Sequence, residues 1–184
     1  WSAKGVFQSI FRILSTDSDT EWVFIDGSYV KAHQHSAGAA SHDQEAIGLS
    51  RAGKTSKIHL AVDGYGLPIA FEIMGGEVHD AKAAPDLLAQ VSIGAMLIAD
   101  TGYDSQAIRD RVESSGKATS IPRRKNSKIG NSGLDQCMYS LRHLVENMFA
   151  RLKHFRAIAT RYDKLKRNFV SLVALACAFI WLPM

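Results

Sequence analysis

Hydrophobic residues recur along this chain with two spacings, one typical of helices and one typical of strands. Residues 2–14 carry apolar side chains three to four positions apart and predict a short amphipathic helix. Residues 21–33 form an apolar, β-rich run that is interrupted at its centre by Asp26, and they predict a strand. Two further β runs within 56–76 surround the sequence Asp-Gly-Tyr-Gly, which predicts a hairpin.

Beyond the hairpin the pattern alternates between helices and short strands. The predicted elements are a helix over 79–91, a buried strand over 95–100, a helix over 104–115, a strand over 117–124, one long helix over 134–164 and a C-terminal packing helix over 168–184. The polar stretch 34–56 is predicted as a long loop. Because hairpins come first and crossover helices follow, we expect an α/β fold with a mixed sheet. One domain spans 1–184, beginning with a helix and loop over 1–20.

Composition supports a globular protein and limits the classes of site. The 184 residues are 46% hydrophobic and 22% charged, which excludes wholesale disorder. Cys137 and Cys177 are the only cysteines, so a disulfide scaffold and a Cys-rich zinc site are excluded and a reducing compartment is favoured. The apolar run 169–184 is shorter than the roughly 20 residues that span a bilayer, so we expect no membrane insertion. Since the first residue is Trp1, we expect a longer product.

The formal net charge of +4 conceals an uneven distribution. Residues 1–100 carry 7 basic and 12 acidic side chains, whereas residues 101–184 carry 15 basic and 6 acidic ones. A basic half suggests a polyanionic partner, and the acidic half leaves carboxylates for another task.

Two short motifs resemble known sites but lie in the wrong context. Residues 48–55 match the phosphate-binding pattern G-x-x-x-x-G-K-[ST], yet a polar stretch precedes them and a strand pattern follows, whereas that loop connects a strand to a helix. A basic hairpin loop, with Arg51, Lys54 and Lys57 able to contact phosphates, or a solvated loop fits better. Residues 100–102 match the aspartic protease tripeptide, but the chain holds one copy and that chemistry needs two.

The long predicted helix carries a polar stripe opposite its apolar side. At 100° per residue, Tyr139, Arg142, Glu146 and Lys153 lie within about 60° of one another. Arg142 and Glu146 could form only a surface ion pair, worth about 0.3–0.5 kcal/mol. The same stripe could instead place a metal-binding carboxylate beside groups that contact phosphate.

Two other carboxylates could reach Glu146. Asp26 interrupts an apolar strand, where a carboxylate is costly to bury unless it is paired or binds a metal. Asp100 ends a buried strand, which is where open α/β sheets place their chemistry. Either could also be a turn-forming aspartate. Three carboxylates together would suit Mg²⁺ or Mn²⁺, and two such ions would activate an attacking oxygen and stabilise the leaving oxygen of a phosphodiester.

With these residues in place, the chain resembles the catalytic domain of bacterial insertion-sequence transposases of the DDE type. Tyr139-x2-Arg142-x3-Glu146-x6-Lys153 matches the Y-R-E-K signature of that group with every spacing intact. Similar blocks are IDGSYVKAH (25–33), SKIHLAVDGYGLPI (56–69), HDAKAAPDLL (79–88) and IADTGYDS (98–105). The end of the chain, from Arg161 on, also resembles the end of that domain.

The resemblance implies an RNase H-like fold with five strands in the order 3-2-1-4-5, the first three antiparallel. It implies Asp26, Asp100 and Glu146 as the catalytic and metal-binding triad for Mg²⁺ or Mn²⁺, with two ions expected. Tyr139, Arg142 and Lys153 would contact DNA, and we add Arg51, Lys54, Lys57, Arg123 and Arg124 as candidate phosphate contacts from their charge.

The implied reaction is hydrolysis at transposon ends, followed by attack of a 3′-OH on target DNA. Relatives carry an N-terminal DNA-binding region that this sequence lacks, so a separate N-terminal polypeptide could supply end recognition. We expect a homodimer or higher oligomer on DNA, located in the cytoplasm at the nucleoid. A ribonuclease H-like nuclease and a domesticated DNA-binding protein without activity remain the alternatives.

Overall fold

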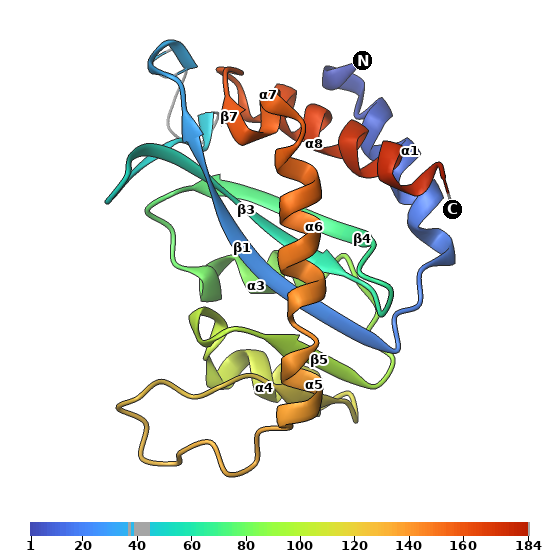
Figure 1. Ribbon diagram of the computed structural model, residues 1–184, viewed down its shortest axis with the longest axis vertical. Helices are drawn as coiled ribbons and strands as arrows, with labels where there is room; N and C mark the ends of the chain where they lie inside the picture. Colours follow the sequence, from blue (N-terminus) through green and yellow to red (C-terminus); the bar gives the residue numbers. More distant parts are fainter. Residues whose placement is uncertain (37, 39–44, 184) are drawn as a thin grey trace.

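The structure is a computed structural model that describes residues 1–36, 38 and 45–183. A mixed sheet forms its centre (Figure 1). Its strands are β1 (Trp22–Ala32), β2 (Gly48–Ser50), β3 (Gly53–Val62), β4 (Pro68–Gly75), β5 (Met96–Ala99), β6 (Ala118–Ser120) and β7 (Thr160–Arg161). β3 pairs antiparallel with β1 and β4, β5 runs parallel to β1, and β6 runs parallel to β5. The order β4-β3-β1-β5-β6 confirms the expected RNase H-like order 3-2-1-4-5.

Two short strands extend this five-stranded core. β2 pairs antiparallel with the start of β3, with Gly48 opposite Thr55, and β7 pairs in parallel with the end of β1. The prediction of a loop over 34–56 was therefore wrong for β2 and for the first residues of β3. A tight hairpin is held by backbone hydrogen bonds, which need no apolar alternation in the sequence. Residues 37 and 39–44 of that predicted loop lie outside the described residues.

The helices cover both faces of the sheet. They are α1 (Val6–Leu14), α3 (Asp80–Leu88), α4 (Gln106–Glu113), α5 (Gln136–Ser140), α6 (His143–Lys153), α7 (Arg156–Ala159) and α8 (Lys166–Trp181), with a 3₁₀ turn η4 (Thr101–Tyr103) after β5. In Figure 1, α6 crosses the sheet in front of β1, while α3 and α4 lie behind it. α1 packs along α8, which is the predicted C-terminal packing helix. Across the described residues, no helix combines the length and apolar character needed to cross a membrane.

The long helix predicted over 134–164 is broken twice and ends at Ala159, because Thr160 and Arg161 form β7 and pair with β1. Leu141 and Arg142 form a turn between α5 and α6, and Phe155 has an extended ψ of 104° between α6 and α7. The first break has a physical reason: Met138, Leu141 and Leu144 recur every three residues and all pack against the core. Hydrogen bonds from residue i to i+3 tighten the chain there to about three residues per turn, which keeps all three on one side.

The core lies on both sides of β1 and β5. The β1 segment Val23–Ile25 and the β5 segment Leu97–Ala99 are completely buried, and α8 contributes Phe169, Val173 and Cys177. Each fully buried aliphatic or aromatic side chain of this size contributes about 1.5–3 kcal/mol. This packing holds the first half of β1 in register with β5, with Ile25 opposite Ala99 at the end of β5.

Candidate active site

Two aspartates lie side by side where β1 and β5 emerge from the core. Asp26 and Asp100 each follow the matched pair Ile25 and Ala99 on neighbouring parallel strands. The amide of Gly27 donates a 2.7 Å hydrogen bond to Oδ1 of Asp26, and the amide of Gly102 donates a 2.7 Å bond to Oδ1 of Asp100. Both carboxylates are thus oriented by the local backbone.

Glu146 is connected to this pair through an arginine. On the face of the sheet covered by α6, the guanidinium of Arg142 donates a 2.7 Å hydrogen bond to Oδ2 of Asp26 and also pairs with Oε1 of Glu146. The Glu146 side chain is 52% exposed, whereas those of Asp26 and Arg142 are 17% and 21% exposed. Arg142 thus lies between Asp26 and Glu146, and Asp100 follows the strand next to Asp26.

The electrostatics of the site are dominated by burial and by charge pairing. Burial raises the pKa of Asp26, and the neighbouring Asp100 carboxylate adds to this, while the Gly27 amide and Arg142 oppose it. Burial alone would lower the pKa of Arg142, but Asp26 and Glu146 outweigh it and the pKa is raised. Arg142 therefore stays charged and relieves the repulsion between the carboxylates.

The other two residues of the polar stripe also face the sheet or the site. Tyr139 on α5 has its ring 5.9 Å from the guanidinium carbon of Arg142, in a cation–π arrangement. Lys153, at the end of α6, donates a 2.6 Å hydrogen bond from Nζ to the hydroxyl of Ser28 on β1. Because Ser28 lies two residues after Asp26, both side chains are on the same face of the strand. The four residues of the polar stripe therefore still face the sheet or the site, although the helix is broken between α5 and α6.

The predicted phosphate contacts fall into three places. Arg51 and Lys54 are exposed at the hairpin between β2 and β3. Arg123 and Arg124 follow β6, and the backbone amide of Arg124 donates a 2.9 Å hydrogen bond to Asp104. Lys57 is different, because it is buried and its ammonium pairs with Asp80 instead of facing solvent.

Sequence reasoning missed a buried pair behind the two aspartates. The hydroxyl of Tyr103 and Nδ1 of His59 share a hydrogen bond of 2.8 Å, and both side chains are completely buried. Burial lowers the pKa of His59 to about 4, and it raises the pKa of Tyr103 with help from Asp80, Asp26 and Asp100. His59 and Tyr103 both lie in sequence blocks that resemble the transposase family. The alternating pattern of the strand did not reveal that the polar side chain of His59 points into the core.

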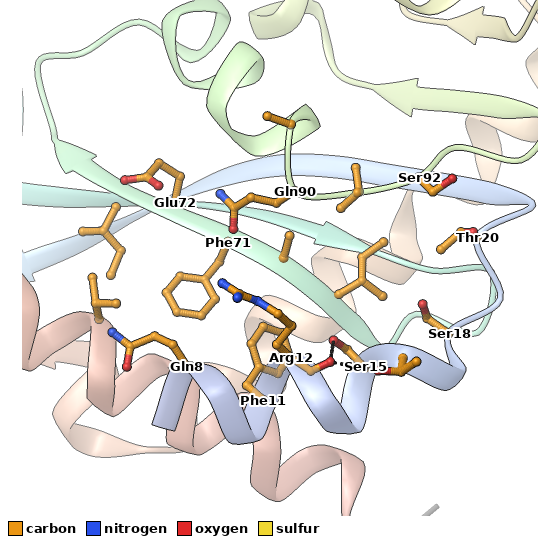
Figure 2. Close-up of a pocket in the computed structure, with 17 residues that line it drawn as sticks. Gln8, Phe11, Arg12, Ser15, Ser18, Thr20, Phe71, Glu72, Gln90 and Ser92 are labelled. Carbon is orange, nitrogen blue, oxygen red and sulfur yellow. Dashed lines mark hydrogen bonds between the residues drawn. The ribbon is translucent and has the colours of Figure 1, made fainter. Parts of the chain in front are cut away.

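A separate cavity of about 670 Å³ lies away from these groups. Figure 2 shows it between α1, β4 and the segment after α3, with Gln8, Arg12 and Glu72 among its lining residues. None of the three carboxylates lines it. The candidate active site lies instead on the sheet, at the central strand β1 and the end of β5.

Comparisons with known proteins identify the family of this chain. The sequence profile of the family described as Transposase DDE domain matches residues 17–181. A Brucella ovis protein assigned as a transposase for insertion sequence element IS6501 is 35% identical over 128 residues, which cover 70% of this chain and 98% of that protein. An uncharacterized protein, y4sN from Sinorhizobium fredii, is 44% identical over 39 residues, covering 21% of this chain and 31% of that protein.

The fold is also similar to that of a solved transposase. The structure of the piggyBac transposase synaptic complex with hairpin DNA gives a TM-score of 0.50 at 11% identity, covering 88% of this chain and 46% of that chain. At this identity the likeness concerns the fold alone. The profile match, by contrast, spans nearly all of the chain and includes Asp26, Asp100 and Glu146. The chain belongs to the Transposase DDE domain family and is a transposase catalytic domain of the bacterial insertion-sequence kind.

Proposed function

We propose that this chain cuts DNA at the ends of a transposable element and joins the freed 3′-OH to target DNA. Asp26, Asp100 and Glu146 would perform this with divalent metal ions. The observation that supports the proposal is their arrangement: two aspartates follow paired residues on adjacent parallel strands, and a glutamate on α6 shares Arg142 with one of them.

The donor set fits a hard divalent cation in its chemistry. Carboxylate oxygens are the ligands that Mg²⁺ and Mn²⁺ prefer, and bound ions activate the attacking oxygen and neutralise charge on the phosphate. Within the described ranges, no three His, Cys, Asp or Glu side chains already surround one point. Glu146 is exposed and is held by Arg142, so joining the two aspartates requires Glu146 to exchange this partner for the ion.

The protein groups around the carboxylates would hold the DNA. Arg142 is stacked on Tyr139, and Lys153 projects along the same face of β1, so both can meet phosphates next to the cut. Arg51, Lys54, Arg123 and Arg124 lie at the hairpin and after β6, where they would extend this contact. Since an element has two ends, two copies of the chain would act together.

A strand-transfer assay tests the proposal. The full chain is incubated with labelled DNA carrying the element ends, with a supercoiled target, and with Mg²⁺, Mn²⁺ or EDTA. We expect joined products that require the metal. Cleavage without joining would favour the nuclease alternative, and DNA binding without any cleavage would favour the inactive DNA-binding alternative.

Arg142→Ala is expected to weaken DNA binding and to lower the slope of log affinity against log salt concentration by about one, because one phosphate contact is lost. The measurement is a titration without metal between about 50 and 200 mM salt. Arg151→Ala is the matched control. Arg151 is an exposed arginine on α6 and lies about 200° around that helix from Lys153, away from the polar stripe. An unchanged slope in Arg142→Ala would contradict the phosphate contact.

A further inference from the structure

A buried polar network lies on the face of the sheet opposite α6. Lys57 and His59 project from β3, and Asp80 begins α3. Nζ of Lys57 pairs with Oδ1 of Asp80, Nδ1 of His59 lies 3.9 Å from the same oxygen, and the Tyr103 hydroxyl bonds to His59. Lys57 and His59 are 5% and 0% exposed, whereas the Asp80 side chain is 16% exposed, so the network is largely shielded from solvent.

The network touches the glycine that orients Asp26. Gly27 is the cross-strand partner of His59, and its amide holds the Asp26 carboxylate. A Cβ on Gly27 would lie 2.7 Å from Cε of Lys57 and 3.1 Å from Nδ1 of His59. The backbone next to Asp26 therefore rests directly on the network.

The same arrangement recurs at Asp100. The amide of Gly102 holds the Asp100 carboxylate, and a Cβ on Gly102 would lie 2.5 Å from Oδ2 of Asp80 and 2.8 Å from Oδ1 of Asp100. Tyr103, the next residue, anchors this turn to β3 through His59. The turn after β5 thus lies against Asp80 at Gly102 and is anchored to β3 by Tyr103.

We propose that Asp80, Lys57, His59 and Tyr103 are positioning residues that set the two aspartates from behind the sheet. The proposal rests on the proposed function, because it assigns these aspartates to the metal site. None of the four needs to touch substrate or metal. They act through Gly27 and Gly102, whose amides aim the two carboxylates, so that loosening the network loosens the site.

Lys57→Met separates this role from a simple effect of charge. Removing a buried cation near the carboxylates should, by electrostatics alone, strengthen the binding of a divalent ion. Positioning predicts the opposite, because Asp80 loses its partner and the turn at Gly102 loosens. Tyr103→Phe is the uncharged counterpart, since it removes only the hydroxyl that bonds to His59.

The test measures amide hydrogen exchange by NMR and Mn²⁺ affinity by calorimetry on the full chain, well below its melting temperature. In both variants we expect exchange at Gly102 to quicken about tenfold relative to Ile98, a reference in the ladder between β1 and β5. We expect Mn²⁺ affinity to fall about tenfold, as when groups supporting a ligand are lost. Lys166→Met, which breaks a 2.7 Å ion pair with Glu72 between α8 and β4, should change neither.

Gly102 exchange that follows Ile98 in both variants would overturn the proposal, as would tighter Mn²⁺ binding by Lys57→Met. If the unaltered chain binds no Mn²⁺, the metal site of the proposed function fails. The exchange at Gly102 still decides the positioning role in that case, because the hydrogen bond to Asp100 needs no metal.

Discussion

Asp26→Asn is expected to lower metal-dependent DNA cleavage by about a thousandfold or more, equivalent to about 4 kcal/mol in the activation barrier. The substitution keeps the shape of the side chain and removes the charge that would bind the ion. The same loss is expected for Asp100→Asn and Glu146→Gln. The measurement is the cleavage rate on labelled end DNA with saturating Mn²⁺.

Asp26→Asn should lose cleavage activity without a large change in the free energy of unfolding. Since burial raises the pKa of Asp26, the ionised carboxylate is less favourable in the folded chain than in the unfolded chain at neutral pH. A neutral asparagine avoids that cost, although it gives up the ion pair with Arg142. We therefore expect a free energy of unfolding within about 1 kcal/mol of the parent.

Asp86→Asn provides the control for the triad, because Asp86 is an exposed aspartate on α3 outside the site. It should cleave DNA at the parental rate. Parental activity in Asp26→Asn, or loss of cleavage only together with unfolding, would contradict the assignment of Asp26 to the metal site.

Arg161→Met is expected to lower the free energy of unfolding by about 3–5 kcal/mol. Arg161 is completely buried, and its guanidinium donates hydrogen bonds to the carbonyls of Glu45 and Ala46 and to the hydroxyl of Ser56. Two further bonds reach carbonyls in the segment before α8. Methionine fills much of the same volume but leaves these acceptors unpaired in the interior.

The charge of Arg161 persists despite its burial. Burial lowers the pKa of Arg161 to about 10, so the side chain remains charged at neutral pH. Arg161→Lys keeps that charge but cannot reproduce the fork of donors, so its loss of stability should be intermediate. Chemical unfolding in urea measures both variants, with Arg156→Met on the surface of α7 as the control. A change below about 1 kcal/mol in Arg161→Met would contradict this role.

Much of the fold could be predicted from pattern alone. The hairpin around residues 63–66 and the strand holding Asp26 stand out because apolar side chains recur at spacings that bury one face. The crossover helices then favour parallel pairing of the later strands, as β5 and β6 show, whereas the strand order was implied only by the resemblance to DDE transposases. These features could be predicted because they depend on the spacing of apolar residues within a segment and on short connections between neighbouring segments.

The residues of the candidate site could be predicted from the sequence, but their arrangement could not. Asp26 is conspicuous as a carboxylate that interrupts an apolar run and Asp100 as one that ends such a run, and the spacing from Arg142 to Glu146 is a simple helical interval. The predicted proximity of Asp26 and Glu146 is supported by their shared contacts with Arg142, whereas Asp100 is near Asp26 through the pairing of β1 with β5. The spacing in sequence cannot show that Arg142 would lie between Asp26 and Glu146.

The sequence by itself determined which segments form the five-stranded core of the sheet and which side chains are available for chemistry, because the period of apolar residues and the residue types are local properties. Only the tertiary structure decided that Lys57 turns inward to Asp80, that Arg142 bridges Asp26 and Glu146, and that the long helix breaks near residue 141. These outcomes depend on contacts between residues far apart in the chain. Their energies are set by burial and by the charges that folding brings together.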